Sequence, residues 1–104
     1  MKITINRKVY DTNTATLIAS DGNDLSHSDF QYWEESLYLT AKGNWFLHGE
    51  GGCMSKYGRP SGHNSYTGSE DIVPLSRQEA FAWCEEHRAQ QAIEDHFADL
   101  ISEA

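Results

Sequence analysis

Basic residues are scarce in this chain. Eight Lys and Arg stand against sixteen Asp and Glu in 104 residues, so the formal net charge is -8 at pH 7. Nucleic-acid binding needs cationic groups that displace counterions from the phosphates. The charge balance therefore argues against direct nucleic-acid binding, and it is compatible either with simple solubility or with a basic partner.

Long hydrophobic runs are also missing, and no stretch approaches the roughly eighteen consecutive apolar residues of a membrane span. The segment from Met1 to Asn6 has no hydrophobic signal core. We therefore expect a soluble, cytoplasmic protein. Cys53 and Cys84 are expected to be free thiols, because no secretion signal accompanies them.

Aromatic residues are plentiful, with three Trp, five Tyr and four Phe. Each ring buries a large area, which compensates for a hydrophobic fraction of only 38%. The length suits one domain, 1–104, with a single modest core. No internal repeat or linker divides it.

The residue pattern predicts short antiparallel strands. Residues 3–10 indicate a strand or a tight hairpin with a turn at Asn6 and Arg7, and residues 15–20 indicate a second strand region. In residues 30–40 the alternation shifts at Glu34 and Glu35, which is typical of a bulge or a one-residue irregularity. Residues 45–47 begin a strand, and residues 71–75 form another, in which Pro74 belongs on a sheet edge or at a strand end.

A C-terminal helical segment begins at a capping box, Ser76 to Glu79. Its first apolar face, at residues 80–87, is out of phase with a second face formed by Ile93, Phe97, Leu100 and Ile101. We therefore predict a bend or break near residues 88–91 and a monomer; a straight helix would instead offer the second face as a homodimer seam. The predicted fold is α+β, a curled antiparallel sheet of four or five short strands covered by this segment.

Six of the eight glycines lie between Gly49 and Gly68. Glycine is used where φ is positive or where another backbone or a ligand comes close, so this loop predicts a demanding geometry. It also contains a candidate small-ligand or enzymatic site, formed by Glu50, Ser55, Lys56 and Tyr57.

Metal binding and cofactors are not expected. The spacings of His48, Glu50, Cys53 and His63 match no zinc pattern. Cys53 lacks an identifiable base and orienting group for nucleophilic catalysis.

Acidic residues are concentrated in the C-terminal segment. A solvated helix face is one interpretation, and a carboxylate array that imitates nucleic-acid phosphates and fills a cationic groove is the other. The candidate partner-binding residues are Glu79, Glu85, Glu86, Glu94, Asp95 and Asp99.

Several motifs are spread over most of the chain: Tyr10-Asp11-Thr12, Thr14-Ala15, Glu35-Ser36-Leu37-Tyr38, Gly43 to Gly52, Ser55-Lys56-Tyr57, Pro74-Leu75-Ser76, Glu79-Ala80 and Trp83. Together they resemble a family of small proteins, without assigned chemistry, carried by bacterial phages, plasmids and integrative elements. The resemblance implies a context of action against host defence, including anti-CRISPR activity, and it transfers no catalytic residue.

We expect a non-enzymatic interaction protein that inhibits a host nucleic-acid-targeting defence complex, such as a CRISPR effector, by occluding a basic surface. Two alternatives stay open. One is a ligand-binding or enzymatic domain centred on the glycine-rich loop, and the other is a regulator that binds another protein without nucleic-acid mimicry.

Overall fold

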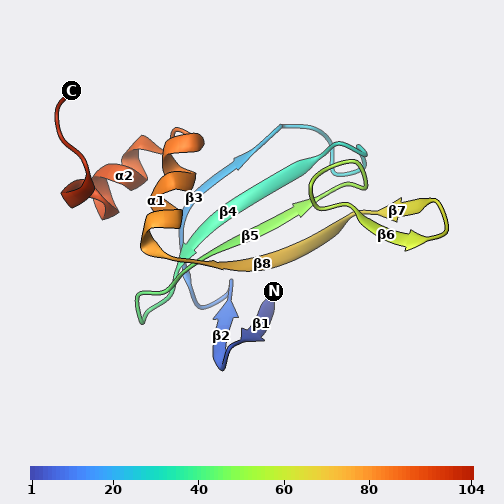
Figure 1. Ribbon diagram of the computed structural model, residues 1–104, viewed down its shortest axis with the longest axis horizontal. Coiled ribbons are helices and arrows are strands. Elements are labelled where there is room, and N and C mark those ends of the chain that lie inside the picture. The colour runs from blue at the N-terminus through green and yellow to red at the C-terminus, as the bar shows by residue number, and fades with distance from the viewer.

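The structure is a computed structural model that describes residues 1–104. Strands form the first three quarters of the chain and helices the last quarter, so the predicted α+β class is confirmed (Figure 1). The strands are β1 (Lys2–Ile5), β2 (Lys8–Asp11), β3 (Thr16–Gly22), β4 (Trp33–Leu39), β5 (Trp45–Gly51), β6 (Arg59–Gly62), β7 (Ser65–Thr67) and β8 (Ser69–Leu75). The helices are α1 (Arg77–Glu86), α2 (Gln90–His96) and a 3-10 turn, η1 (Ala98–Leu100).

A four-stranded antiparallel sheet with the order β3-β4-β5-β8 is the centre of the molecule. β1–β2 and β6–β7 are separate two-stranded hairpins. Because β8 is an edge strand, Pro74 lies on an edge as predicted.

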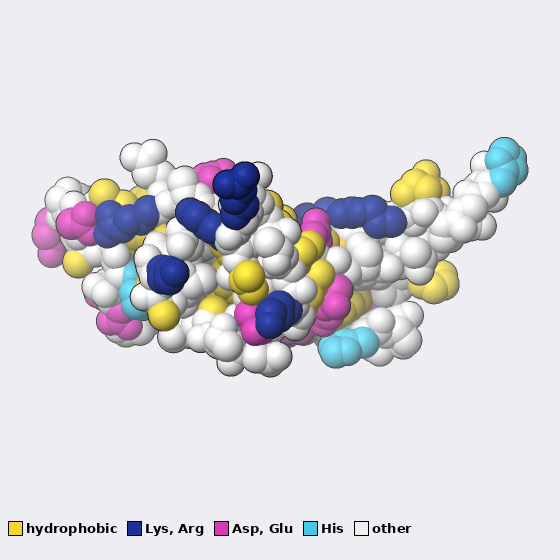
Figure 2. All heavy atoms as spheres, turned by 90° about the horizontal axis from the view of Figure 1, so that it is seen from below, with side chains coloured by type: hydrophobic (Ala, Val, Ile, Leu, Met, Phe, Trp, Pro, Cys, Tyr) yellow, Lys and Arg dark blue, Asp and Glu magenta, His cyan; other side chains and the backbone are white.

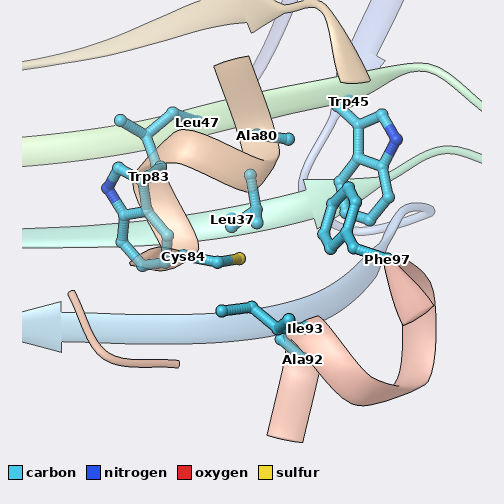
Figure 3. Close-up of a cluster of buried hydrophobic side chains, with 9 residues drawn as sticks. All are labelled: Leu37, Trp45, Leu47, Ala80, Trp83, Cys84, Ala92, Ile93 and Phe97. Atoms are coloured by element: carbon cyan, nitrogen blue, oxygen red, sulfur yellow. The ribbon is translucent and has the colours of Figure 1, made fainter. Parts of the chain in front are cut away.

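One face of the central sheet packs against the helices, where the main hydrophobic core lies. In Figure 3 the ring of Trp45 lies against Phe97, and Leu37 lies between the sheet and the helices. Complete burial of a Leu or Phe side chain stabilises the fold by about 1.5–3 kcal/mol. The core consists of Leu37, Trp45, Leu47, Ala80, Trp83, Cys84, Ala92, Ile93 and Phe97.

The opposite face carries a second, smaller core under the β1–β2 hairpin. Tyr10 from β2 meets Phe46 edge-on, with ring centroids 5.4 Å apart, and Ile72 completes the cluster. Asn6 and Arg7 adopt φ values of 51° and 67°, the left-handed pair that a two-residue hairpin turn requires. The N-terminal hairpin and its turn are therefore confirmed. Helices and hairpin cover opposite faces of the sheet.

The C-terminal segment begins and breaks where the sequence predicts. The Ser76 hydroxyl accepts from the Glu79 amide and the Glu79 carboxylate accepts from the Ser76 amide, which is the predicted capping box. α1 ends at Glu86, Arg88 takes a left-handed φ of 56°, and α2 starts at Gln90. The break turns the second apolar face back onto the sheet.

That second face is only partly buried. Ile93 and Phe97 are in the core, but Leu100 and Ile101 remain 42% and 41% exposed. The reason is that α2 ends at His96, and after the 3-10 turn the backbone is extended at Ile101. The last two apolar residues therefore leave the helical face on which their spacing placed them.

The predicted bulge at Glu34 and Glu35 is wrong. β4 pairs with β5 in continuous register from Trp33 to Leu39, and the only shift in the central sheet is in β3, between Leu17 and Ala19. Glu35 has the same parity as Leu37 and is 1% exposed. The apparent change of alternation thus arises because Glu35, in a regular strand, points into the protein interior.

The molecule is long and flat, with extents of 50 × 35 × 19 Å. Its radius of gyration, 15.1 Å, exceeds the roughly 13 Å of a typical compact chain of this length. Figure 1 shows the reason, because the β6–β7 hairpin projects at one end and the helices lie at the other. The longest helix has ten residues, and none is both long and apolar enough to cross a membrane.

Candidate functional site

The most buried charged group is Glu35 in β4. Its carboxylate accepts hydrogen bonds from Tyr57 Oη at 2.5 Å and Trp83 Nε1 at 3.1 Å, and it pairs with Lys56 Nζ at 2.5 Å. Burial alone would raise the pKa of Glu35, but hydrogen bonds from Lys56, Tyr57 and Trp83 outweigh it and hold the pKa below its ordinary value. Glu35 is therefore a buried anion with its partners in place.

The local sequence explains how this network fits between sheet and loop. Gly49 is the direct partner of Glu35 on β5, and a Cβ at Gly49 would lie within 1.7 Å of Tyr57 Oη. The missing side chain is what admits the Tyr57 ring. Burial and the neighbouring Glu35 carboxylate raise the pKa of Tyr57, so the phenol stays protonated and donates.

A histidine extends the network to the sheet edge. His87, at the end of α1, stacks on Trp83 with ring centroids 4.3 Å apart. Its Nδ1 is 2.6 Å from Asp21 Oδ2, and its Nε2 is 3.6 Å from Glu35 Oε1. The His87 hydrogen bond lowers the pKa of Asp21.

This network resembles an acid–base chain, but its central group is closed to a substrate. Glu35 lines none of the main surface pockets. A general acid or base must come within hydrogen-bond reach of a reacting group. The arrangement instead ties the glycine-rich loop, the sheet and α1 together.

The four candidate loop residues do not form one site. Lys56 and Tyr57 both engage Glu35 on the helix-side face. Ser55 stays within the loop, where its hydroxyl donates to the Gly52 carbonyl and accepts from the Tyr57 amide. Glu50 lies on the other face of the sheet, where it accepts from Tyr32 Oη at 2.8 Å.

The six candidate partner-binding acids of the C-terminal segment are all exposed. Three have partners within the chain: Glu79 in the capping box, Asp95 with Gln91 Nε2 at 2.9 Å, and Asp99 with Arg77. The Arg77 hydrogen bond lowers the pKa of Asp99. The other three have neither a hydrogen bond nor an ion pair with a side chain, and they are Glu85, Glu86 and Glu94.

Positive charge is concentrated on the opposite side of the sheet. Four of the eight basic residues lie on the β1–β2 hairpin or in the turn between β4 and β5. Figure 2 looks onto this side of the molecule and shows Lys and Arg side chains spread over it. These four residues are Lys2, Arg7, Lys8 and Lys42.

A polar surface, which we call the open face, continues beyond the hairpin on the same side of the sheet. Three glutamates lie directly across from one another on adjacent strands, Glu34 opposite Glu50 and Glu50 opposite Glu70. They lie beside a pocket of about 550 Å³ that contains no Lys or Arg in its lining. His27 and Tyr32 line the same pocket.

The potential metal ligands considered from the sequence are dispersed. His48 Nε2 pairs with Glu70 Oε2 at 2.9 Å, Cys53 follows β5 in the loop, and His63 lies in the turn between β6 and β7. The structure instead groups Glu50 with Glu34 and His27, whose potential ligand atoms all lie within 4.8 Å of one another.

Sequence reasoning missed both clusters. For Glu35 a signal was present, because it shares parity with Leu37 and Leu39 on β4. For His27 there was none, since it lies in an irregular loop whose path no periodicity defines.

Comparison with protein-family models, curated proteins and solved structures finds no match for this chain.

Proposed function

We propose that this chain is a small acidic interaction protein, without enzymatic activity, that binds a basic surface of another protein or nucleoprotein complex. The proposed binding surface is the outer face of α1, α2 and η1. It includes the six acidic residues Glu79, Glu85, Glu86, Glu94, Asp95 and Asp99.

The observation that carries this proposal is the set of unpartnered carboxylates at Glu85, Glu86 and Glu94. All three are exposed and bind nothing within the chain. The hairpin cations lie on the other side of the sheet, so they do not neutralise this surface. Arg77 and Arg88 are also exposed on this segment, so the surface has an excess of negative charge rather than one charge sign. Such an excess attracts a basic surface and raises the association rate.

The partner class follows from the same chemistry. A basic groove that normally holds a phosphate backbone presents several cations to an array of carboxylates. We therefore propose a host complex that targets nucleic acid, such as a CRISPR effector, blocked by a protein of mobile-element origin. The resemblance to small mobile-element proteins supports this choice.

The loop alternative receives less support. A ligand or substrate at Lys56 and Tyr57 would compete with Glu35, which already engages both side chains. Glu50 is on the other face of the sheet and is not available to the same ligand.

Two matched double variants test the proposal. Glu86→Lys with Glu94→Lys changes the proposed surface, and Asp24→Lys with Glu70→Lys makes the same change of net charge elsewhere. All four positions are exposed, so the fold is expected to persist. A Lys at position 86, at the C-terminal end of α1, also interacts favourably with the helix dipole.

The measurement is a pull-down from host cells that carry a nucleic-acid-targeting defence system, read by mass spectrometry. The wild type and the Asp24/Glu70 variant should capture a basic nucleic-acid-binding complex, and the Glu86/Glu94 variant should not. Capture should weaken steeply as salt is raised. Equal capture by a folded Glu86/Glu94 variant would contradict the proposed surface.

A further inference from the structure

Three glutamates in one row across a sheet repel one another. Glu34, Glu50 and Glu70 occupy directly paired positions on β4, β5 and β8, where like charges destabilise the pairing. His48 forms a hydrogen bond with Glu70, with 2.9 Å between Nε2 and Oε2. Neither Glu34 nor Glu50 has an ion pair with a Lys or Arg.

The hydroxyl of Tyr32, which has one proton to donate, lies within hydrogen-bond distance of both of these carboxylates. The side chain is 6% exposed, and its Oη lies 2.8 Å from Glu50 Oε1 and 3.0 Å from Glu34 Oε2. One hydroxyl can donate to only one acceptor at a time, and the charge of the pair stays uncompensated.

The cluster also includes an imidazole, which comes from a different segment of the chain. His27 lies in the loop between β3 and β4, and its ring packs against the Tyr32 ring with centroids 4.5 Å apart. A potential ligand nitrogen of His27 and one oxygen each from Glu34 and Glu50 all lie within 4.8 Å of one another.

The loop that carries His27 is fixed at its ends. Asn23 Nδ2 donates to the Gln31 carbonyl at 2.8 Å, and Asn23 Oδ1 accepts from the Trp33 amide at 3.1 Å. The Gly52 amide donates to the Tyr32 carbonyl at 2.8 Å. These bonds hold the loop over the open face.

We propose that His27, Glu34 and Glu50 form a binding site for a divalent metal ion. One imidazole nitrogen with two carboxylates suits Zn²⁺, since Mg²⁺ and Ca²⁺ prefer oxygen ligands alone. Ligands at about 2.1 Å from Zn²⁺ in a tetrahedron are about 3.4 Å apart, so a closure of up to about 1.4 Å by the exposed His27 and Glu34 and the half-buried Glu50 completes the set.

The surroundings of this site leave room for a further ligand. His27 and Tyr32 line both the 550 Å³ pocket and a second pocket of about 450 Å³, with Glu50 in the first and Glu34 in the second. A tetrahedral ion held by three side chains keeps its fourth position for water or another small donor, and that position is reached from solvent. This site is independent of the helix-face surface proposed above.

Titration calorimetry with Zn²⁺ on the chelator-treated full chain tests the site. The wild type should bind one ion, and Glu50→Gln and His27→Ala should each weaken the affinity at least tenfold. The matched controls are Glu103→Gln and His63→Ala, at exposed positions outside the cluster, and they should bind as the wild type does. Mg²⁺ and Ca²⁺ should bind at least tenfold more weakly than Zn²⁺.

A second readout separates ligation from folding. NMR of the imidazole groups should show the His27 ring signals shifting on Zn²⁺ addition while those of His63 stay in place. Failure of the wild type to bind Zn²⁺, or equal loss of affinity in the control variants, would overturn the site. Unchanged affinity in both Glu50→Gln and His27→Ala would do the same.

Discussion

Glu35 shows how one residue can organise a small domain. Its carboxylate gathers donors from the glycine-rich loop and from α1, elements that are distant in sequence. Unpaired, a buried carboxylate is costly, so the network stabilises the one arrangement in which every donor is in place. Its neighbour Glu34 points to the opposite face and is exposed.

These adjacent glutamates provide a matched pair of variants. Glu35→Ala leaves Tyr57 Oη and Trp83 Nε1 buried without their acceptor, at about 1–3 kcal/mol for each. Glu34→Ala removes a like charge opposite Glu50 and is expected to leave stability unchanged or slightly higher. Urea unfolding measures the free energy of unfolding of both variants. An equal loss of stability in the two would contradict the assigned orientation of β4.

The depressed pKa of Glu35 predicts how stability depends on pH. Because the folded pKa is below the unfolded value of about 4.3, the contribution of Glu35 is present above that pH and is lost as pH falls through the folded value. The difference in unfolding free energy between the wild type and Glu35→Gln should therefore narrow as the solution is acidified. A difference that stays constant down to about pH 3 would rule out this linkage.

Individual residues were the hardest level to predict from the sequence. The capping box at Ser76 and Glu79 is a local pattern and was predicted in full. The role of Glu35 depends on Tyr57, Trp83 and Lys56, which only the tertiary fold brings together. Sequence reasoning interpreted the neighbouring Glu34 and Glu35 as an irregularity of the strand, because isolated charges are seldom buried.

At the scale of elements, the glycine-rich loop requires glycine because other atoms lie close to its backbone, and not because its φ values are positive. Gly43, in the turn between β4 and β5, is the only glycine with positive φ. Within the loop, a Cβ at Gly51 would meet Ser55 Oγ at 2.2 Å, and one at Gly52 would meet the Asp29 and Phe30 carbonyls at 2.5 Å. The backbone here is packed against other backbone, which no larger residue allows.

Two glycine variants test this account of the loop. Gly49→Ala forces the Tyr57 ring away from Glu35 and should lower stability by about 1–3 kcal/mol, the range typical of overpacking. Gly62→Ala meets nothing within 4 Å and should change stability by less than about 0.5 kcal/mol. Thermal unfolding compares them, and equal melting temperatures would mean that the loop does not require Gly49.

Elements with a strong local pattern were predicted, and those without one were not. The N-terminal hairpin and the helix break near Arg88 follow from turn residues and from apolar phase. The β6–β7 hairpin was missed because all its residues are exposed, so no buried face imposes an alternation on Arg59 to Thr67.

At the scale of the whole molecule, the folded-back α2 predicts a monomer. Phe97 is fully buried within its own chain, against Trp45 and Phe81, so it offers no seam to a second copy. Sedimentation equilibrium should give the monomer mass of 11.8 kDa. Phe97→Asp should lower stability by placing a carboxylate in the core. A wild-type dimer that this variant converts to a folded monomer would contradict the prediction.

The net charge of the molecule follows from its composition, but the distribution of the charged residues over its surface does not. Sequence predicted an acidic C-terminal surface, and the structure exposes all six of its candidate partner-binding acids. It also separates them from the hairpin cations on the other side of the sheet. That separation depends on the packing of helices and hairpin on opposite faces, which no local pattern specifies.

Competition with nucleic acid tests the proposed function most directly. A purified defence complex captured by this chain is loaded with labelled target nucleic acid, and release of the label is measured as the chain is added. The wild type and the Asp24/Glu70 double variant should displace the nucleic acid, whereas the Glu86→Lys, Glu94→Lys variant should not. Binding of the wild type without displacement, or equal displacement by the Glu86/Glu94 variant, would contradict the proposal that these carboxylates occupy a nucleic-acid groove.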